Sequence, residues 1–323
     1  MKKVLVTGGA GFIGSHLVEE LLNKGCFVYV LDDLSTGKLA NIKHLLKNKN
    51  FKFKKGSVLD KKVLNPLIQK SEQIYHLAAA VGVKLIMEHP LESLNTNIFG
   101  THNVLEIASR KKIPVLITSS SEAYGKNGDT PFHEHSDRVY GSSYNIRWGY
   151  ALSKTLDEFL ALAYFREKKS PTVTVRLFNT TGPRQTGNYG MVVPNFIKQA
   201  LAHKPITVHG NGEQSRCFSY VHDITRAMIA LLNNKKAYGE IFNLGSEERI
   251  SIKDLAEKVK KMTNSKSRIV FIPHKKVYGE NFEDMNIRVP DISKVKILAA
   301  YAPTYTLHDI LSKTIDYYKT NLI

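Results

Sequence analysis

The feature that most constrains the fold lies near the start of the chain, where glycines interrupt an apolar segment. The segment Lys3–Thr7 is rich in Val and Leu, as is typical of a strand buried on both faces. Residues 13–22 then place apolar side chains at helical spacing, and Gly8, Gly11 and Gly14 occupy the turn between the two segments. Glycines at this spacing let backbone N–H groups approach a pyrophosphate, and the start of the helix adds its positive dipole end. The sequence therefore predicts a phosphate-binding turn.

Acidic residues follow the second apolar segment. The segment Cys26–Leu31 ends at Asp32 and Asp33, about where a dinucleotide-binding unit places the carboxylate that meets the ribose hydroxyls of adenosine. A carboxylate at Asp32 repels a 2′-phosphate, so we expect NAD rather than NADP as the cofactor.

The rest of the chain alternates strand-like and helix-like segments, which predicts an α/β fold with a doubly wound parallel sheet. We expect strands at 51–54, 73–78, 115–119 and 172–178, and helices at 91–110 and 150–168. Past residue 182 the sequence predicts a mixed α/β lobe, with strands at 206–209 and 240–244 and helices at 194–203, 223–233 and 252–262. The expected division is an NAD-binding domain over 1–180 and a smaller substrate lobe over 181–323, with some later segments returning to the first domain. Ligands in such sheets bind beyond the carboxyl ends of the strands.

Composition narrows the class of protein. None of the apolar runs in the 323 residues approaches the length of a membrane span, so no integral membrane association is expected. The net charge of +17 comes from scattered lysines without interleaved aromatic residues, which favours a solvated surface over a nucleic-acid partner. Cys26 and Cys217 are the only cysteines, and neither Cys-x-x-Cys nor clustered His occurs, so no metal site is expected. A free cysteine in a buried strand favours a reducing, cytoplasmic location.

Two further segments carry groups suited to acid–base chemistry. Ser119–Glu122 follows the strand expected at 115–119, so these residues lie at its carboxyl end, facing the ligand crevice. Tyr150 and Lys154 are four residues apart and share one face of a helix. We expect the ammonium and a cationic nicotinamide to lower the pKa of the phenol. Tyr150 can then take a proton from a sugar hydroxyl while hydride leaves the same carbon, with Ser120 orienting that oxygen.

Together with other segments, these motifs resemble the extended short-chain dehydrogenase/reductases that modify nucleotide sugars, over nearly the whole chain. The matching segments are TGGAGFIG, HLAA (His76–Ala79), NTNIFGTHNVLE from Asn95, SSSEAYG from Ser119, YALSK, RLFNTTGPR from Arg176, GNGEQSRCFSYVHD from Gly210 and RVPDISK from Arg288. The resemblance implies an extended Rossmann fold, tightly bound NAD, and oxidation of a nucleotide sugar, here a UDP-sugar, at carbon 4. The resulting ketone permits epimerisation, decarboxylation or dehydration.

The resemblance also implies roles for residues at matching positions. The implied catalytic residues are Ser120, Glu122, Tyr150 and Lys154. The implied substrate ligands are Ser121, Asn179, Val193, Arg216 and Arg288, and a guanidinium fork suits the diphosphate. The implied cofactor ligands are Gly8, Gly11, Phe12, Ile13, Gly14, Asp32, Asp33, Ser35, Thr36, Gly37, Ser57, Val58, Leu77, Ala78, Ala79, Asn97, Ser119, Tyr150 and Lys154. Many relatives carry Asp where this chain has Ser57, so we expect the adenine contact there through the backbone of Val58.

The reaction that follows oxidation depends on Glu122. Dehydratases carry a proton-abstracting Glu there after an Asp, whereas this chain has Ser121 before it. UDP-glucuronate decarboxylases carry Ser-Glu, as here, but many of them have an arginine where this chain has Met191. The segment IRWGYALSK resembles both decarboxylases and bacterial proteins classed as sugar epimerases, and VYGENFEDMNIRVPDI resembles decarboxylases. We rank a 4-epimerase first, a UDP-glucuronate decarboxylase second and a 4,6-dehydratase third.

Two further expectations concern class and assembly. Some chains with this fold bind NAD without catalysis, but they often lack the Tyr or the Lys, and both are present here. Similar proteins pair the helices expected at 91–110 and 150–168 across a two-fold axis, so we expect a homodimer. The second of these helices carries apolar residues at helical spacing, namely Leu156, Phe159, Leu160 and Ala163.

Overall fold

The glycine pattern leads from a strand into a helix in the computed structural model, which describes residues 1–187, 191–278, 285 and 287–321. Strand β1 (Lys3–Thr7) is followed by the turn and by helix α1 (Phe12–Asn23). Val4 and Val6 belong to one apolar core and Leu5 to another, and all three are fully buried. Because successive side chains of a strand point to opposite faces, both faces of the sheet are covered.

In the described part of the chain, the main sheet has seven parallel strands in the order β11-β6-β5-β4-β1-β2-β3. These are, besides β1, the strands β2 (Phe27–Asp32), β3 (Phe51–Lys55), β4 (Gln73–His76), β5 (Val115–Ser120), β6 (Thr172–Leu177) and β11 (Glu240–Leu244). The strand order changes direction at β1, so a ligand crevice is expected where β1 and β4 diverge. The predicted doubly wound α/β sheet is confirmed.

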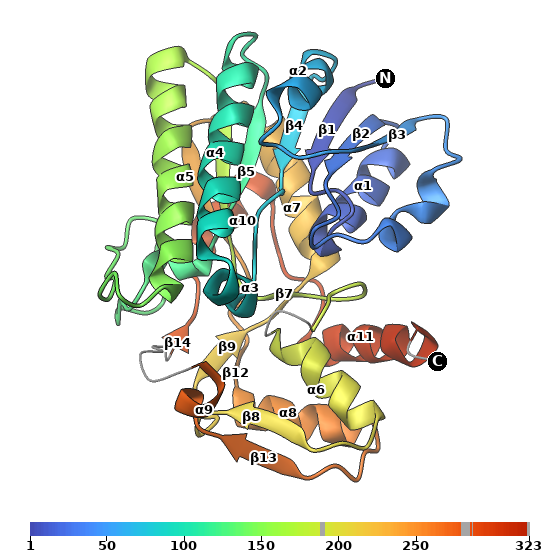
Figure 1. The fold of residues 1–323 in the computed structure, drawn as a ribbon, viewed down its shortest axis with the longest axis vertical. Coiled ribbons are helices and arrows are strands. Elements are labelled where there is room, and N and C mark those ends of the chain that lie inside the picture. The colour runs from blue at the N-terminus through green and yellow to red at the C-terminus, as the bar shows by residue number, and fades with distance from the viewer. Residues whose placement is uncertain (188–190, 279–284, 286, 322–323) are drawn as a thin grey trace.

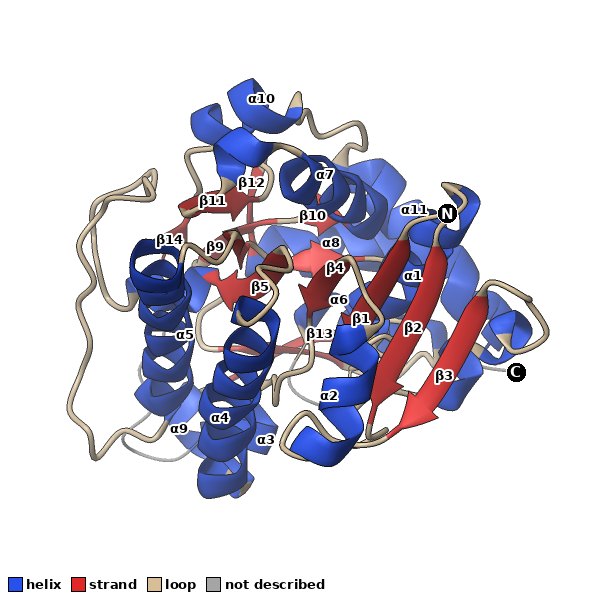
Figure 2. Ribbon diagram, turned by 90° about the horizontal axis from the view of Figure 1, so that it is seen from above, coloured by secondary structure: helices blue, strands red, loops and turns tan. Residues whose placement is uncertain are grey.

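Helices cover both faces of this sheet (Figure 2). One face carries α2 (Lys61–Gln69), α4 (Pro90–Ser109) and α5 (Arg147–Lys168), and the other carries α1, α7 (Val221–Asn233) and α10 (Ser293–Ala299). The shorter helices are α3 (Val83–Glu88), η1 (Leu39–Asn41), η2 (Lys43–Leu45), η3 (Ser121–Tyr124) and η4 (Lys235–Ala237). Helix α5 begins at Arg147 rather than at Tyr150, and at this spacing the two residues lie on one face of the helix.

A smaller lobe lies below the main sheet in Figure 1. Its helices are α6 (Val192–Leu201), α8 (Ile252–Met262), α9 (His274–Tyr278) and α11 (Leu307–Asn321). Its strands are β8 (Ile206–His209) with β13 (Ile269–Ile272), β7 (Thr180–Thr181) with β10 (Ser219–Tyr220), and β12 (Arg249–Ser251), β9 (Ser215–Cys217) and β14 (Ile287–Arg288). Helices α6, α8 and α11 share an apolar core of their own with β8.

The expected division at residue 180 does not separate the two lobes completely, because some segments after residue 180 lie in the larger lobe. The sequence analysis places 240–244 among the strands of the second lobe, whereas β11 pairs with β6 in the main sheet. Helix α7, just before it, packs on α1. Residues 221–244 lie in the larger layer because Phe242 and Leu244 belong to the core that β1 and α1 share. Much of the segment VYGENFEDMNIRVPDI lies outside the described residues. None of the described helices is long and apolar enough to cross a membrane.

Candidate active site

The glycine turn leaves the start of α1 open to an anion. Gly8 has a left-handed backbone (φ 72°), and a Cβ at Gly14 would lie only 2.1 Å from the Gly8 carbonyl oxygen. The turn therefore closes only with glycine at these two positions. Gly11, which precedes α1, makes no side-chain cap, so the first N–H groups of the helix are left for another acceptor. The diphosphate of a dinucleotide fits this cradle, because its oxygens accept from N–H groups and its charge suits the helix dipole.

Asp32 lies beside the cradle as the last residue of β2. Its carboxylate accepts hydrogen bonds from the backbone N–H groups of Ala10 (2.9 Å) and Leu34 (2.8 Å). Burial raises the pKa of this carboxyl, and the two N–H donors oppose that rise. Its place at the end of the second strand is the one from which a carboxylate binds ribose hydroxyls.

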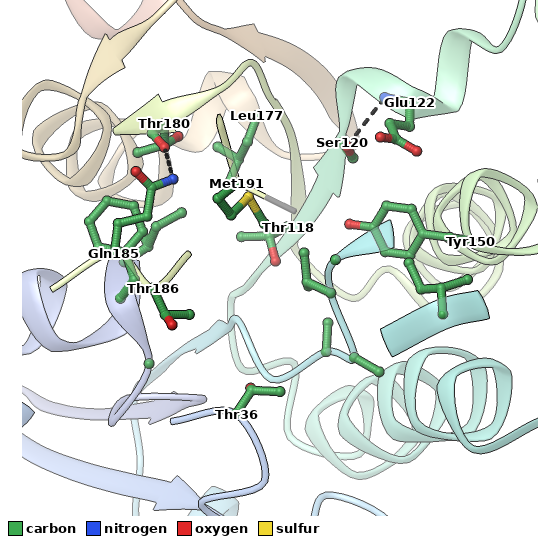
Figure 3. Close-up of a pocket in the computed structure, with 18 of the residues that line it drawn as sticks. Thr36, Thr118, Ser120, Glu122, Tyr150, Leu177, Thr180, Gln185, Thr186 and Met191 are labelled. Atoms are coloured by element: carbon green, nitrogen blue, oxygen red, sulfur yellow. Dashed lines mark hydrogen bonds between the residues drawn. The ribbon is translucent and has the colours of Figure 1, made fainter. Parts of the chain in front are cut away.

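A cavity of about 640 Å³ extends from the cradle to the smaller lobe. Figure 3 shows part of its lining. Most of the expected cofactor residues line it, namely Gly8, Gly11, Phe12, Ile13, Gly14, Asp32, Asp33, Ser35, Thr36, Val58, Leu77, Ala78, Ala79, Ser119, Tyr150 and Lys154. All the other expected catalytic and substrate residues line it as well, namely Ser120, Ser121, Glu122, Asn179, Val193, Arg216 and Arg288. The sequence analysis did not assign a role to further lining residues, among them Thr118, Arg147, Leu177, Gln185 and Thr186.

Three expected cofactor residues do not line the cavity: Gly37, Ser57 and Asn97. A Cβ at Gly37 would lie 2.8 Å from Oδ1 of Asp32, so the glycine leaves room for that carboxylate. The Ser57 hydroxyl accepts a hydrogen bond from the N–H of Leu59 (3.2 Å) and supports the turn after β3. Val58 reaches the cavity instead of Ser57, in keeping with the expected adenine contact.

The third, Asn97, acts from behind the cavity. Its side chain accepts from the N–H of Ala80 (2.8 Å) and donates to the carbonyl of the same residue (3.3 Å). It is buried on α4 and thus fixes the loop after β4, which lines the cavity. Asn97 therefore supports the lining of the cavity rather than forming part of it.

The end of the cavity that we expect to be catalytic is lined by Ser120, Glu122 and Tyr150, which lie close together in Figure 3. The pKa of Tyr150 is raised chiefly by burial and further by the Glu122 carboxylate, whereas a hydrogen bond with Ser120 lowers it. Lys154, which we expect to lower this pKa in the presence of the cofactor, has its ammonium 3.1 Å from Oδ2 of Asp157. Both members of that ion pair are buried. Asp157 therefore balances the charge that the lysine would otherwise present to Tyr150.

Glu122 also lies near two arginines from distant parts of the chain. Its Oε1 is 3.6 Å from Nη2 of Arg147 and 3.4 Å from Nη1 of Arg288. Arg288 on β14 is in register with Arg216 on β9, so strand pairing sets side by side the expected diphosphate ligand Arg216 and Arg288, which is expected to bind the diphosphate or the sugar. Arg147 is not among the site residues expected from the sequence. Arg147 is three residues before Tyr150, and residues at this spacing share a face of a helix. The pattern could be recognised only if the helix was expected to begin at Arg147 rather than at Tyr150.

The remaining expected substrate residues lie where the two lobes meet. Asn179 has a positive φ of 35°, and its Nδ2 donates to the carbonyl of Cys217 (2.9 Å) in β9. Val193 is buried in the first turn of α6, and Ser121 is buried at the start of η3. Asn179 thus ties the end of the main sheet to the strand that carries Arg216.

Comparison with known sequences agrees with this geometry. The sequence model of the family described as GDP-mannose 4,6 dehydratase matches residues 5–314. The chain is 42% identical over 319 residues to the UDP-N-acetyl-alpha-D-glucosaminuronate decarboxylase of Bacillus cytotoxicus, covering 98% of each chain. It is 36% identical over 323 residues to UDP-glucuronic acid decarboxylase 1 of Xenopus tropicalis, covering 99% of this chain and 73% of that one.

Solved structures share the fold. The UDP-glucuronic acid 4-epimerase of Bacillus cereus, in complex with UDP-glucuronic acid and NAD, has a TM-score of 0.88 at 33% identity and covers 98% of this chain and 99% of its own. The UDP-glucose 4-epimerase of Thermotoga maritima, solved with UDP-glucose, has a TM-score of 0.90 at 28% identity. The match covers 99% of this chain and 100% of that chain. These findings confirm the resemblance and NAD as the cofactor. The chain belongs to the family described as GDP-mannose 4,6 dehydratase, and it is an NAD-dependent enzyme of the extended short-chain dehydrogenase/reductases that act on nucleotide sugars.

Proposed function

We propose that this enzyme decarboxylates a UDP-hexuronate after oxidising it at carbon 4. The observation that carries the proposal is the pair of guanidinium groups, Arg147 and Arg288, beside Glu122 at the catalytic end of the cavity. Guanidinium groups bind carboxylates through strong paired hydrogen bonds, so a sugar with a carboxylate on carbon 5 has partners here. A neutral hexose has no charge to offer them. The arginine pair therefore supports a uronate over a neutral hexose. The decarboxylases at 42% and 36% identity are the reason we rank decarboxylation ahead of 4-epimerisation, the first choice from the sequence.

The proposed reaction assigns a task to each group at this end of the cavity. When bound, NAD accepts the hydride that leaves carbon 4. Tyr150 takes the proton of the 4-hydroxyl, and Ser120 donates a hydrogen bond to the oxygen that becomes the ketone. The bond between carbon 5 and the carboxylate then breaks, carbon dioxide leaves, and the electron pair moves onto the ketone oxygen as an enolate. A proton enters at carbon 5, and Glu122 is the carboxyl group proposed to relay it. The hydride then returns to carbon 4 and Tyr150 gives its proton back to the oxygen there, so the product is the pentose and the bound cofactor ends in its oxidised form.

The relatives support a choice among uronates. UDP-N-acetylglucosaminuronate is the first candidate substrate and UDP-glucuronate the second, following the identities of 42% and 36% to decarboxylases named for these sugars. Epimerisation of a UDP-hexuronate at carbon 4 is the second candidate function. It is supported by the likeness to the Bacillus cereus 4-epimerase, which was solved with UDP-glucuronic acid.

The test is incubation of the NAD-loaded enzyme with UDP-N-acetylglucosaminuronate, UDP-glucuronate and UDP-glucose, with products analysed by mass spectrometry and NMR. We expect loss of carbon dioxide from at least one uronate and no change in UDP-glucose. An unchanged mass with inversion at carbon 4 would establish the epimerase instead, and loss of water would establish a dehydratase.

A variant of Arg147 tests the observation itself. Arg147→Lys keeps a positive charge but loses the planar fork, so we expect KM for the uronate to rise about tenfold while NAD affinity is unchanged. An unchanged KM would remove Arg147 from carboxylate recognition.

A further inference from the structure

One face of α5 carries a row of three buried side chains, Tyr150, Lys154 and Asp157. Their spacing of four and then three residues keeps them on one face of the helix. Lys154 lines the cavity, whereas Asp157 does not. The distance of 3.1 Å between Nζ of Lys154 and Oδ2 of Asp157 makes the carboxylate a direct partner of the lysine.

We propose that Asp157 is a positioning residue of the active site, which anchors the Lys154 ammonium and balances its charge. The lysine has two other tasks at this place, since it is expected to hold the nicotinamide ribose and to act on Tyr150. A buried ammonium without a counterion is strongly disfavoured, so the carboxylate stabilises the lysine in a position from which it can perform both tasks.

The groups around Tyr150 are consistent with this role. Tyr150 has Glu122 of η3 on the cavity side, the hydroxyl of Ser120 at the end of β5, and Asp157 further along its own helix. After burial, the negative charges of Glu122 and Asp157 raise the pKa of the phenol, and the hydrogen bond with Ser120 lowers it. Asp157 therefore favours the protonated form of Tyr150, opposite to the effect expected of the lysine alone.

Within the described residues, Asp157 is the carboxylate that pairs with Lys154, because the other titratable groups nearby are paired elsewhere or neutral. Glu158, the next carboxylate on α5, is engaged instead by Arg176 of β6 at 2.8 Å. His76 of β4 is fully buried, and burial together with the charge of Lys154 lowers its pKa to about 3, so it stays neutral. Burial raises the pKa of Asp157, and the neighbouring ammonium opposes that rise.

Asp157→Asn tests the proposal because the amide keeps the shape and an acceptor oxygen but removes the charge. The lysine then acts on Tyr150 unopposed, so we expect the acid limb of the kcat–pH profile to move to lower pH by about one unit. Asp157→Glu is the matched control. It retains the charge, so its acid limb should coincide with that of the unmodified enzyme even where the longer side chain slows turnover.

A second measurement needs no substrate. Ultraviolet titration of the NAD-loaded enzyme, with the Tyr150→Phe variant subtracted, follows the ionisation of Tyr150 itself. We expect a lower midpoint in Asp157→Asn than in Asp157→Glu. Although the inference concerns the site of the proposed function, this titration contains no sugar, so a failure of decarboxylation does not affect it. Coincident midpoints, or a higher midpoint in Asp157→Asn, would overturn the proposal, even if the variant is less stable.

Discussion

Nη1 of Arg288 lies 3.4 Å from Oε1 of Glu122, although 166 positions separate the two residues in the chain. Glu122 follows the end of β5 in the main sheet, whereas Arg288 belongs to β14 in the smaller lobe. The contact therefore joins the two lobes at the catalytic end of the cavity. A substrate carboxylate that pairs with Arg288 must share this guanidinium with Glu122, which couples substrate binding to the position of the second carboxyl group.

Glu122→Gln separates the two leading reactions. The amide keeps the volume and most hydrogen bonds but cannot relay a proton. For decarboxylation we expect product formation to fall by about a hundredfold or more, with NADH accumulating on the enzyme because the oxidation step is intact. Absorbance of NADH and the mass of the product measure the two steps separately. A loss below about tenfold without NADH accumulation would favour 4-epimerisation, which needs only Tyr150 for its proton.

Tyr150→Phe removes the proton acceptor and keeps the ring. We expect turnover to fall by about a hundred- to ten-thousandfold, the usual contribution of a positioned acid–base group. Affinities for NAD and for the UDP-sugar, measured by calorimetry, should stay unchanged because the packing around the ring is kept. Near-normal turnover would place the base elsewhere.

Asp32 underlies the expected preference for NAD over NADP. In the double variant Asp32→Ala, Asp33→Arg, the repelling carboxylate is lost and a guanidinium is added for a 2′-phosphate, so the ratio of the two affinities should fall by about tenfold or more. Asp33→Arg alone is the control, because Asp33 is exposed and its carboxylate accepts hydrogen bonds from the backbone N–H and the hydroxyl of Ser35 in its own turn. Tighter binding of NADP than of NAD to the unmodified protein would contradict the prediction.

The outer face of α5 supports the expected homodimer. Leu156 is 42% exposed and Phe159 is 60% exposed, whereas Leu160 packs against the core. We expect Leu156→Asp with Phe159→Asp to give a monomer of 36.4 kDa in light scattering, because a charged pair is costly in an apolar interface. Ile297→Asp is the control. It is 83% exposed on α10, on the opposite side of the sheet, and should leave the dimer intact. A monomeric unmodified protein at micromolar concentration would refute the prediction.

Two buried histidines predict acid sensitivity. Burial lowers the pKa of His16 to about 4 and the pKa of His76 to about 3. In the unfolded chain the pKa of each histidine is about 6.5. The unfolded chain therefore binds more protons below pH 6.5, so the free energy of unfolding falls as the pH falls. At pH 5 each histidine contributes a loss of about 2 kcal/mol.

Urea unfolding of the His76→Gln variant measures this contribution. His76 is bonded to Thr7 (2.7 Å) and Thr101 (3.2 Å), so the variant should be less stable at pH 7. Its further loss between pH 7 and pH 5 should nevertheless be smaller than that of the unmodified protein by about 2 kcal/mol. Equal losses in the two proteins would contradict the assignment.

Local patterns in the sequence sufficed for the parts of the site that lie within one strand, turn or helix. The glycines at Gly8, Gly11 and Gly14, the carboxylate at Asp32, and the pair Tyr150 and Lys154 all lie within or next to elements whose periods are visible in the sequence. Their relative placement follows from 2.0 residues per repeat in a strand and 3.6 per turn in a helix. The parallel order of the strands then places these residues at one edge of the sheet.

Only the tertiary structure decided what surrounds those residues. The pairing of β14 with β9 brings Arg288 next to Glu122. The earlier start of α5 places Arg147 on the helix that faces the same carboxylate. Asp157 is three residues from Lys154 in any helix, but it is a buried counterion rather than a surface charge because α4 packs against α5. Strand pairing and helix packing join residues far apart in the chain, and no local period in the sequence encodes which distant side chain will be the neighbour. The charges around Tyr150 are therefore set by the folded chain as a whole.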